Sequence, residues 1–143
     1  MKRIVIATDG SPDAAVAVAQ GLELAAALQG RVTFVYARTT VADDISRSRA
    51  VIADAMGRAT IARVDADYEI RDGSPGEAVV TVADSHDADL IVVGSRGLGA
   101  VQGVLFGSVS RWLVTHCDRP VLVVKVPKAA DVTASDAARS PVG

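Results

Sequence analysis

The sequence contains little cysteine and few aromatic residues. Cys117 is the only cysteine among 143 residues, which excludes an internal disulfide and a zinc site built from several thiolates. Aromatic residues make up only 3% of the chain whereas half of the residues are hydrophobic, so valine, isoleucine, leucine and alanine must form the core. This composition favours a parallel β-sheet that is sandwiched by alanine-rich helices.

The chain also lacks an excess of positive charge and any segment of transmembrane length. Its formal net charge is −2 and its pI is about 5.6, which provides no electrostatic basis for nucleic acid as a partner. The apolar run near the start is too short for a secretory signal, and no later run is long enough to cross a bilayer. We therefore expect a soluble, cytoplasmic protein that contacts no membrane.

Short apolar runs alternate with helical patterns along the chain. Continuous runs rich in β-branched residues predict strands that are buried on both faces. The expected strands are 3–8, 32–37, 68–71, 89–93 and 120–126. The expected helices are 14–28, 44–64, about 75–86 and 108–117. Five strands that alternate with four helices require right-handed crossovers, so we expect an α/β fold with an open parallel sheet.

Helix ends, one helix face and a domain boundary are predicted in more detail. Ser11 and Ser74 each precede a proline, which is typical of a helix start, and Gly30 would end the first helix. After Pro127 the sequence is small, polar and aperiodic, so we expect a domain at 1–127 and a flexible tail at 128–143. In the second helix, the buried face would be formed by Ile45, Ile52, Met56 and Ile61.

Five glycines fall within the eighteen residues 93–110, VGSRGLGAVQGVLFGSVS, directly after the fourth expected strand. Open parallel sheets bind ligands beyond the carboxyl ends of their strands, so this position favours a binding loop. The stretch does not match the dinucleotide pattern GxGxxG, because Gln102 stands where the third glycine belongs, and no P-loop GK[ST] occurs in the chain. What it contains is Gly94-x2-Gly97, nine further residues, and then Gly107-Ser108.

That spacing has a physical rationale as a phosphate site. Gly94 and Gly97 would let backbone N–H groups converge on an anion after the strand, while Gly107 opens a helix whose first N–H groups attract phosphate. Hydroxyl and guanidinium donors would come from Ser95, Arg96, Ser108 and Ser110. Alternatively, the glycines only shape a surface loop and Ser108 only caps a helix. If the stretch is a phosphate site, the spacer AVQGVLF at 100–106 is a flap through which a partner protein could detect ligand binding.

The start IVIATDGS, the glycine pattern and the ending RPVLVVK together resemble the universal stress protein family over nearly the whole chain except its tail. The resemblance implies a UspA-like domain with five parallel strands in the order 3-2-1-4-5. Such a fold is Rossmann-like, of the adenine nucleotide alpha hydrolase-like type, with helices on both faces. The glycine pattern is the one associated with the ATP-binding branch, which implies a stress-response sensor or regulator that binds ATP.

The resemblance also implies a set of binding residues. Thr8 and Asp9 would face the ribose, the backbone of Ala37 would meet adenine, and Val93 and Gly94 would line the nucleoside. The phosphates would be surrounded by Arg96, Gly97, Gly107, Ser108, Val109 and Ser110.

Asp9 has a chemical reason to lie in such a site. A carboxylate after a buried strand accepts from ribose hydroxyls or holds Mg²⁺ through water. It can equally form an Asx turn with Gly10, and the two roles are compatible. No residue of the chain is predicted to ligate a metal directly.

The sequence does not point to a catalytic residue. His86 and His116 are expected at helix ends, where their charge would favour the helix dipole, and no base and acceptor pair is recognisable around Asp9. We expect ATP binding, with at most slow hydrolysis. The last strand, 120–126, would be a sheet edge, and relatives pair two such edges, which implies a homodimer. Alternatively, Lys125 and the tail guard that edge.

Two other functions stay open at this point. One is binding of cyclic AMP, which would use the adenine pocket but leave part of the phosphate site empty. The other is a nucleotide-independent interaction module, in which the glycine loop is only a dimer or partner surface.

Overall fold

The computed structural model describes residues 2–40, 45–97 and 106–126. The strands are β1 (Arg3–Ala7), β2 (Arg31–Arg38), β3 (Asp65–Asp72), β4 (Leu90–Gly94) and β5 (Val121–Val124). The helices are α1 (Pro12–Leu28), α2 (Ile45–Ala62), α3 (Pro75–Ser85) and α4 (Ser108–His116). All strand pairs are parallel, in the order β3-β2-β1-β4-β5, which confirms the predicted fold. The expected tail at 128–143 lies outside the described residues, and the boundary at 127 stays a prediction.

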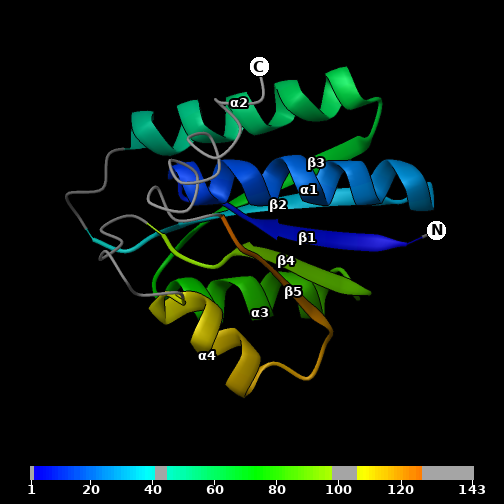
Figure 1. Cartoon of the computed structure of the whole chain (residues 1–143). Helices are drawn as coiled ribbons and strands as arrows, with labels where there is room; N and C mark the ends of the chain where they lie inside the picture. Colours follow the sequence, from blue (N-terminus) through cyan, green and yellow to red (C-terminus); the bar gives the residue numbers. More distant parts are fainter. Residues whose placement is uncertain (1, 41–44, 98–105, 127–143) are drawn as a thin grey trace, which may run out of the picture.

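Figure 1 shows α1 and α2 on one face of the sheet and α3 and α4 on the other. Alternation along β1 explains this two-sided burial. Ile4 and Ile6 join the core that α1 and α2 cover, whereas Val5 joins the core under α3 and α4. Because both faces are covered, β1 reads in the sequence as a continuous apolar run.

Helix α1 begins after Ser11 and ends at Leu28 as predicted, but the residue that closes it is not the expected glycine. The Ser11 hydroxyl accepts from the N–H of Ala14 at 3.2 Å, and proline follows at the first helical position. The left-handed residue at the end is Gln29, with φ of 52°, rather than Gly30. Gly30 is needed for close approach instead, because a Cβ there would lie 2.7 Å from the carbonyl oxygen of Lys2.

The expected buried face of α2 is wrong in two of its four residues. Ile61 is 85% exposed because it follows Ile52 by nine residues, which places it half a turn round the helix. Ile45 is 39% exposed at the first helical position. The buried face consists of Ser48, Ile52, Ala55 and Ala59.

The two edge strands differ in length from the prediction. β3 is longer than expected and pairs with β2 along eight residues, from Asp65 to Asp72. Its sequence DADYEIRD carries charges that suit a solvent-exposed edge, so the apolar signal is weak there. β5 is shorter than expected, at four residues.

Arg119 ties the turn before β5 to the end of α3. Its guanidinium donates to Asp84 at 3.1 Å and to the carbonyl oxygen of Ala88 at 2.6 Å. The hydrogen bond to Asp84 raises the pKa of Arg119 above its usual value.

No helix in the described ranges combines the length and the apolar character needed to span a membrane.

Candidate functional site

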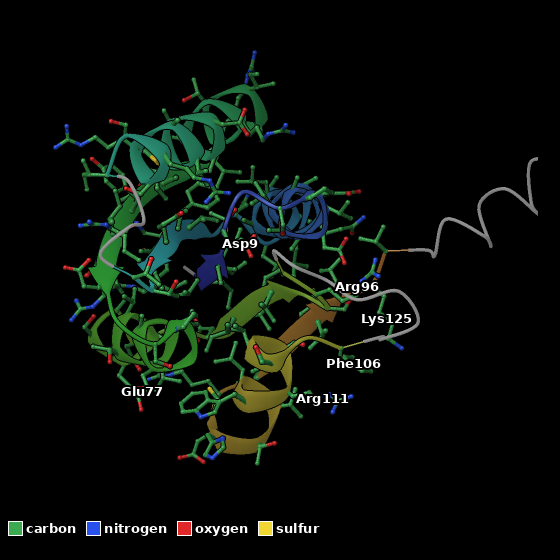
Figure 2. All side chains as sticks on the ribbon, turned by 90° about the vertical axis from the view of Figure 1, so that its left-hand side faces the viewer. Asp9, Glu77, Arg96, Phe106, Arg111 and Lys125 are labelled. Carbon is green, nitrogen blue, oxygen red and sulfur yellow. The ribbon has the colours of Figure 1, made fainter. Side chains whose placement is uncertain are left out.

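A cavity of about 480 Å³ opens where β1, β2 and β4 end. This volume falls within the range of small-molecule sites, and the place is the one where parallel sheets bind ligands. Figure 2 looks onto these carboxyl ends, with Asp9 near the centre and Arg96, Phe106 and Lys125 on the side of β4 and β5. The loops that follow the three strands, together with the starts of α3 and α4, form its walls.

All eleven binding residues that the sequence suggested line this one cavity. They are Thr8, Asp9, Ala37, Val93, Gly94, Arg96, Gly97, Gly107, Ser108, Val109 and Ser110. Nine further lining residues were not in that set: Ala7, Ala14, Val35, Tyr36, Thr39, Pro75, Val79, Ser95 and Phe106. Some of these nine adjoin suggested binding residues at the ends of β1, β2 and β4, so the sequence could have indicated them. Pro75 and Val79 could not be found in this way, because they reach the cavity only through the packing of α3.

The Asp9 carboxylate joins the loop after β1 to the loop after β4. Its Oδ1 accepts from the N–H of Ser11 at 2.9 Å, which is the expected Asx turn. Its Oδ2 faces Gly97, where an added Cβ would lie 2.7 Å away. Residue 97 is therefore glycine because a carboxylate occupies the space that a side chain would fill.

The other two glycines of the pattern also permit close approach. A Cβ on Gly94 would lie 3.0 Å from the carbonyl oxygen of Asp13, at the start of α1. A Cβ on Gly107 would lie 3.3 Å from the Cα of Arg96. In the described part of the chain only Gly10 and Gly73 are glycines with positive φ, so tight packing explains this pattern better than left-handed backbone.

Two expected phosphate donors are used inside the protein instead. The carbonyl oxygen of Ser95 accepts from the N–H of Gly107 and, at 2.9 Å, from the hydroxyl of Ser110. The Ser110 hydroxyl also lies 3.1 Å from the carbonyl oxygen of Gly107, and the side chain is buried. These bonds hold the two ends of the glycine loop together. The first N–H groups of the helix, those of Ser108, Val109 and Ser110, have no acceptor within the helix, so they and the Ser108 hydroxyl are the donors that can face a ligand here.

The starts of α1, α3 and α4 lie at the cavity, and α1 and α4 differ in how they are capped. At α1, Ser11 caps the first turn, proline brings no N–H, and the carboxylate of Asp13 already lies in the first turn. At α4, the capping residue is Gly107, and no described side chain caps the helix. Since the positive end of a helix attracts anions, α4 offers the better place for a phosphate.

Arg96 is paired with an acidic residue that the sequence did not single out. Its Nε donates to Oδ2 of Asp13 at 2.9 Å, and the two side chains are only 20% and 11% exposed. Arg96 lines the cavity as expected, but its charge is offset by a nearby carboxylate. In the sequence, Asp13 looks like an ordinary acidic residue in the first turn of a helix.

Arg47 is a second contributor that sequence reasoning missed. It extends from α2 and donates through Nη1 to the hydroxyl of Tyr36 at 2.8 Å and through Nη2 to the carbonyl oxygen of Asp9 at 3.1 Å. The arginine thereby links the ends of β1 and β2 through two residues that line the cavity. Nothing in the sequence near Arg47 signals this role, because it depends on where α2 packs.

Several features of the prediction lie elsewhere or outside the described residues. His86 pairs with Glu69 at 2.8 Å and His116 stacks on Trp112, and neither histidine lines the cavity. Within the described ranges no three His, Cys, Asp or Glu side chains group in a way that could hold a metal ion. Most of the expected flap falls in 98–105, outside the described residues. Its last residue, Phe106, lines the cavity beneath Lys125, whose Nζ lies 5.4 Å from the ring centre.

The sequence has recognisable relatives. The model of the universal stress protein family matches residues 1–125. A universal stress protein of Thermus aquaticus is 36% identical over 137 residues, which cover 87% of this chain and 98% of that protein. The stress response protein NhaX of Bacillus subtilis is 39% identical over 79 residues, which cover 55% of this chain and 48% of that protein.

Solved structures of similar fold agree with these matches. A universal stress protein in complex with cAMP has a TM-score of 0.72 at 28% identity, and covers 86% of this chain and 96% of its own. The universal stress protein UspA from Lactobacillus plantarum has a TM-score of 0.70 at 26% identity, with coverage of 86% and 97%. The family match over most of the sequence and the shared fold lead to one conclusion: this chain belongs to the universal stress protein family.

Proposed function

We propose that the cavity binds an adenine nucleotide, with ATP as the ligand that a stress-response sensor or regulator of this kind would read. The observation that carries the proposal is the convergence of all eleven suggested binding residues on one cavity of about 480 Å³. The cAMP complex of a 28% identical universal stress protein supports a nucleotide of this class.

The nucleoside would occupy the part of the cavity near β1, β2 and β4. Val93, Val79 and the backbone of Ala37 provide an apolar slot for a flat ring, which suits recognition by shape and by backbone groups. Thr8 and Asp9 would contact the ribose. Asp9 is held in place by Ser11, so its acceptor geometry is fixed before the ligand arrives.

The phosphates would lie against the start of α4. The N–H groups of Ser108 and Val109, the exposed Ser108 hydroxyl and the positive end of the helix all favour an anion there. A bound Mg²⁺ would meet the single carboxylate of Asp9 through water and take its remaining ligands from the phosphates and solvent, which is the coordination that Mg²⁺ prefers. A metal would neutralise part of the phosphate charge; no protein residue is proposed to ligate it directly.

Calorimetry with ATP, AMP and cyclic AMP, each with and without Mg²⁺, tests the proposal, with GTP as the control for the base. We expect the adenine nucleotides to bind and GTP to bind far more weakly. Gly107→Val should weaken ATP binding, since its Cβ would lie 3.3 Å from the Cα of Arg96. If none of the adenine nucleotides binds, the proposal is wrong and the interaction module becomes the better explanation.

Cyclic AMP is a second candidate ligand because two expected polyphosphate donors are occupied. Gly107 N–H and the Ser110 hydroxyl bond to carbonyl oxygens of the loop, which leaves fewer groups for a long phosphate chain. Direct competition between ATP and cyclic AMP in the presence of Mg²⁺ separates the two. Two expectations stay predictions: that ATP is hydrolysed slowly at most, and that the protein is cytoplasmic.

We also propose a homodimer through β5. Ile91 N–H donates to the carbonyl oxygen of Pro120, and Ser95 N–H donates to that of Val124. Because successive residues of a strand direct their backbone groups to opposite sides, those of Val121 and Val123 point away from β4, to the open edge. Pairing of two such edges about a twofold axis would satisfy them. Light scattering should give a dimer for the wild type and for Val123→Thr, and a monomer for Val123→Pro. A monomeric wild type over a wide concentration range would refute this pairing.

A further inference from the structure

The guanidinium that lines the phosphate end of the cavity is already paired with a carboxylate. Among the described lining residues the charged side chains are Asp9 and Arg96. Arg96 is neutralised by Asp13 at 2.9 Å, and the pair is shielded from solvent because the two side chains are only 20% and 11% exposed. The segment 98–105, LGAVQGVL, contains no charged residue. Next to the lining residues, Asp13 adds a carboxylate at Arg96, whereas Lys125 lies over Phe106 and Arg47 donates to the carbonyl oxygen of Asp9.

A partly buried ion pair responds differently to ligands than a surface pair. Its attraction is weakly screened, so an incoming anion does not readily draw Arg96 away from Asp13. At the same time, the carboxylate repels each additional negative charge on the ligand. The electrostatic free-energy cost of binding the ligand rises with the number of phosphate charges and falls when a divalent cation offsets them.

We propose that Asp13 is a specificity-determining residue that makes the cavity favour nucleotides of low phosphate charge and makes ATP binding depend on Mg²⁺. It acts by neutralising Arg96 and by adding its own charge behind the phosphate position. The proposal rests on the adenine nucleotide binding proposed above. It extends that function by stating which charge state of the ligand the site selects.

Asp13→Asn tests this directly, because the amide keeps the shape of the side chain and removes its charge. Calorimetry would compare ATP in EDTA, ATP with Mg²⁺, and cyclic AMP. We expect the affinity for metal-free ATP to rise about tenfold, equivalent to about 1.4 kcal/mol, and the affinity for cyclic AMP to change about twofold or less. The gain with Mg²⁺ present should be smaller than the gain in EDTA.

Matched controls separate the local effect from a change in net charge. Asp54→Asn removes a carboxylate from an exposed pair with Arg58 on α2, so it alters net charge equally and should leave all three affinities unchanged. In the Asp13→Asn background, Arg96→Gln should remove the gain, because the gain comes from the released guanidinium. If Asp13→Asn melts well below the wild type, Asp13→Ser provides a second neutral residue that the first turn of a helix tolerates.

Each outcome decides between clear alternatives. A fall in ATP affinity for Asp13→Asn would mean that Asp13 positions Arg96 for phosphate. Equal gains in affinity for ATP and cyclic AMP would mean that Asp13 does not discriminate between ligands by their phosphate charge. Either result overturns the inference while nucleotide binding stands. An equal gain for Asp54→Asn overturns it too. If the wild type and Asp13→Asn bind none of these nucleotides, the proposed function fails and the inference fails with it.

Discussion

Gly97→Ala adds one methyl group where the loop after β4 meets the loop after β1. The new Cβ would lie 2.7 Å from Oδ2 of Asp9, closer than the 3.0 Å that real Cβ atoms keep from their neighbours. Gly97 is not among the glycines with positive φ, so the alanine backbone itself is unstrained. The substitution therefore perturbs the contact with Asp9 and little else.

The size of the effect follows from how firmly Asp9 is held. To reach ordinary contact at 3.4 Å, Cβ and Oδ2 must separate by about 0.7 Å. Asp9 cannot swing freely, because Oδ1 accepts from Ser11 and its carbonyl oxygen accepts from Arg47. Overpacking of this kind costs about 1–3 kcal/mol. If the displacement falls on the binding geometry, ATP affinity should drop about tenfold, since about 1.4 kcal/mol corresponds to that factor.

Calorimetry with Mg²⁺ and ATP measures the loss, and thermal unfolding measures the accompanying change in stability. Gly57→Ala is the matched control, because residue 57 is exposed within α2 and a Cβ there meets nothing within 4 Å. That change should raise the free energy of unfolding by about 0.5–1 kcal/mol and leave ATP affinity unaltered. Wild-type affinity in Gly97→Ala would refute the argument that the contact between the Asp9 carboxylate and residue 97 shapes the site, as would an equal loss in both variants.

Three further changes test the packing around the cavity. Ser110→Ala removes the hydroxyl that holds the loop ends together, and should lower the free energy of unfolding by about 1 kcal/mol and weaken ATP binding; unchanged stability in urea unfolding would contradict it. Gly76→Ala places a Cβ against the ring of Trp112 and should destabilise the protein by about 1–3 kcal/mol in the same assay; an unchanged free energy of unfolding would contradict it. Leu113→Ala empties a fully buried position of α4 and should cost about 2–5 kcal/mol, whereas Val114→Ala, at 62% exposure, should cost far less.

The central part of the fold follows from the sequence because burial on both faces leaves a strong signal. The runs at β1, β2 and β4 contain few polar residues, and Ser-Pro pairs mark two helix starts. The edges of the sheet are less predictable. β3 alternates charged and apolar residues along an exposed edge, so its sequence indicated only half of its length.

The site was predictable to the extent that it lies in loops next to strand ends. Its glycines and serines occur in one short stretch, and the order of the strands brings the loop after β1 beside that stretch. Arg47 and Asp13 were not predictable, because each acts through a partner that is distant in sequence. Arg47 contacts Asp9 across 38 positions, and Asp13 contacts Arg96 across 83.

The double hydrogen bond at the carbonyl oxygen of Ser95 has a consequence for chain entropy. It holds together the two ends of the segment 96–106, which we call its neck. The ends of these eleven residues therefore meet independently of what lies between them. Loop-closure entropy rises only slowly with length, by about 0.6 kcal/mol for each doubling. We therefore expect a longer or different segment inserted between Gly97 and Phe106 to leave the neck closed at a small cost in entropy.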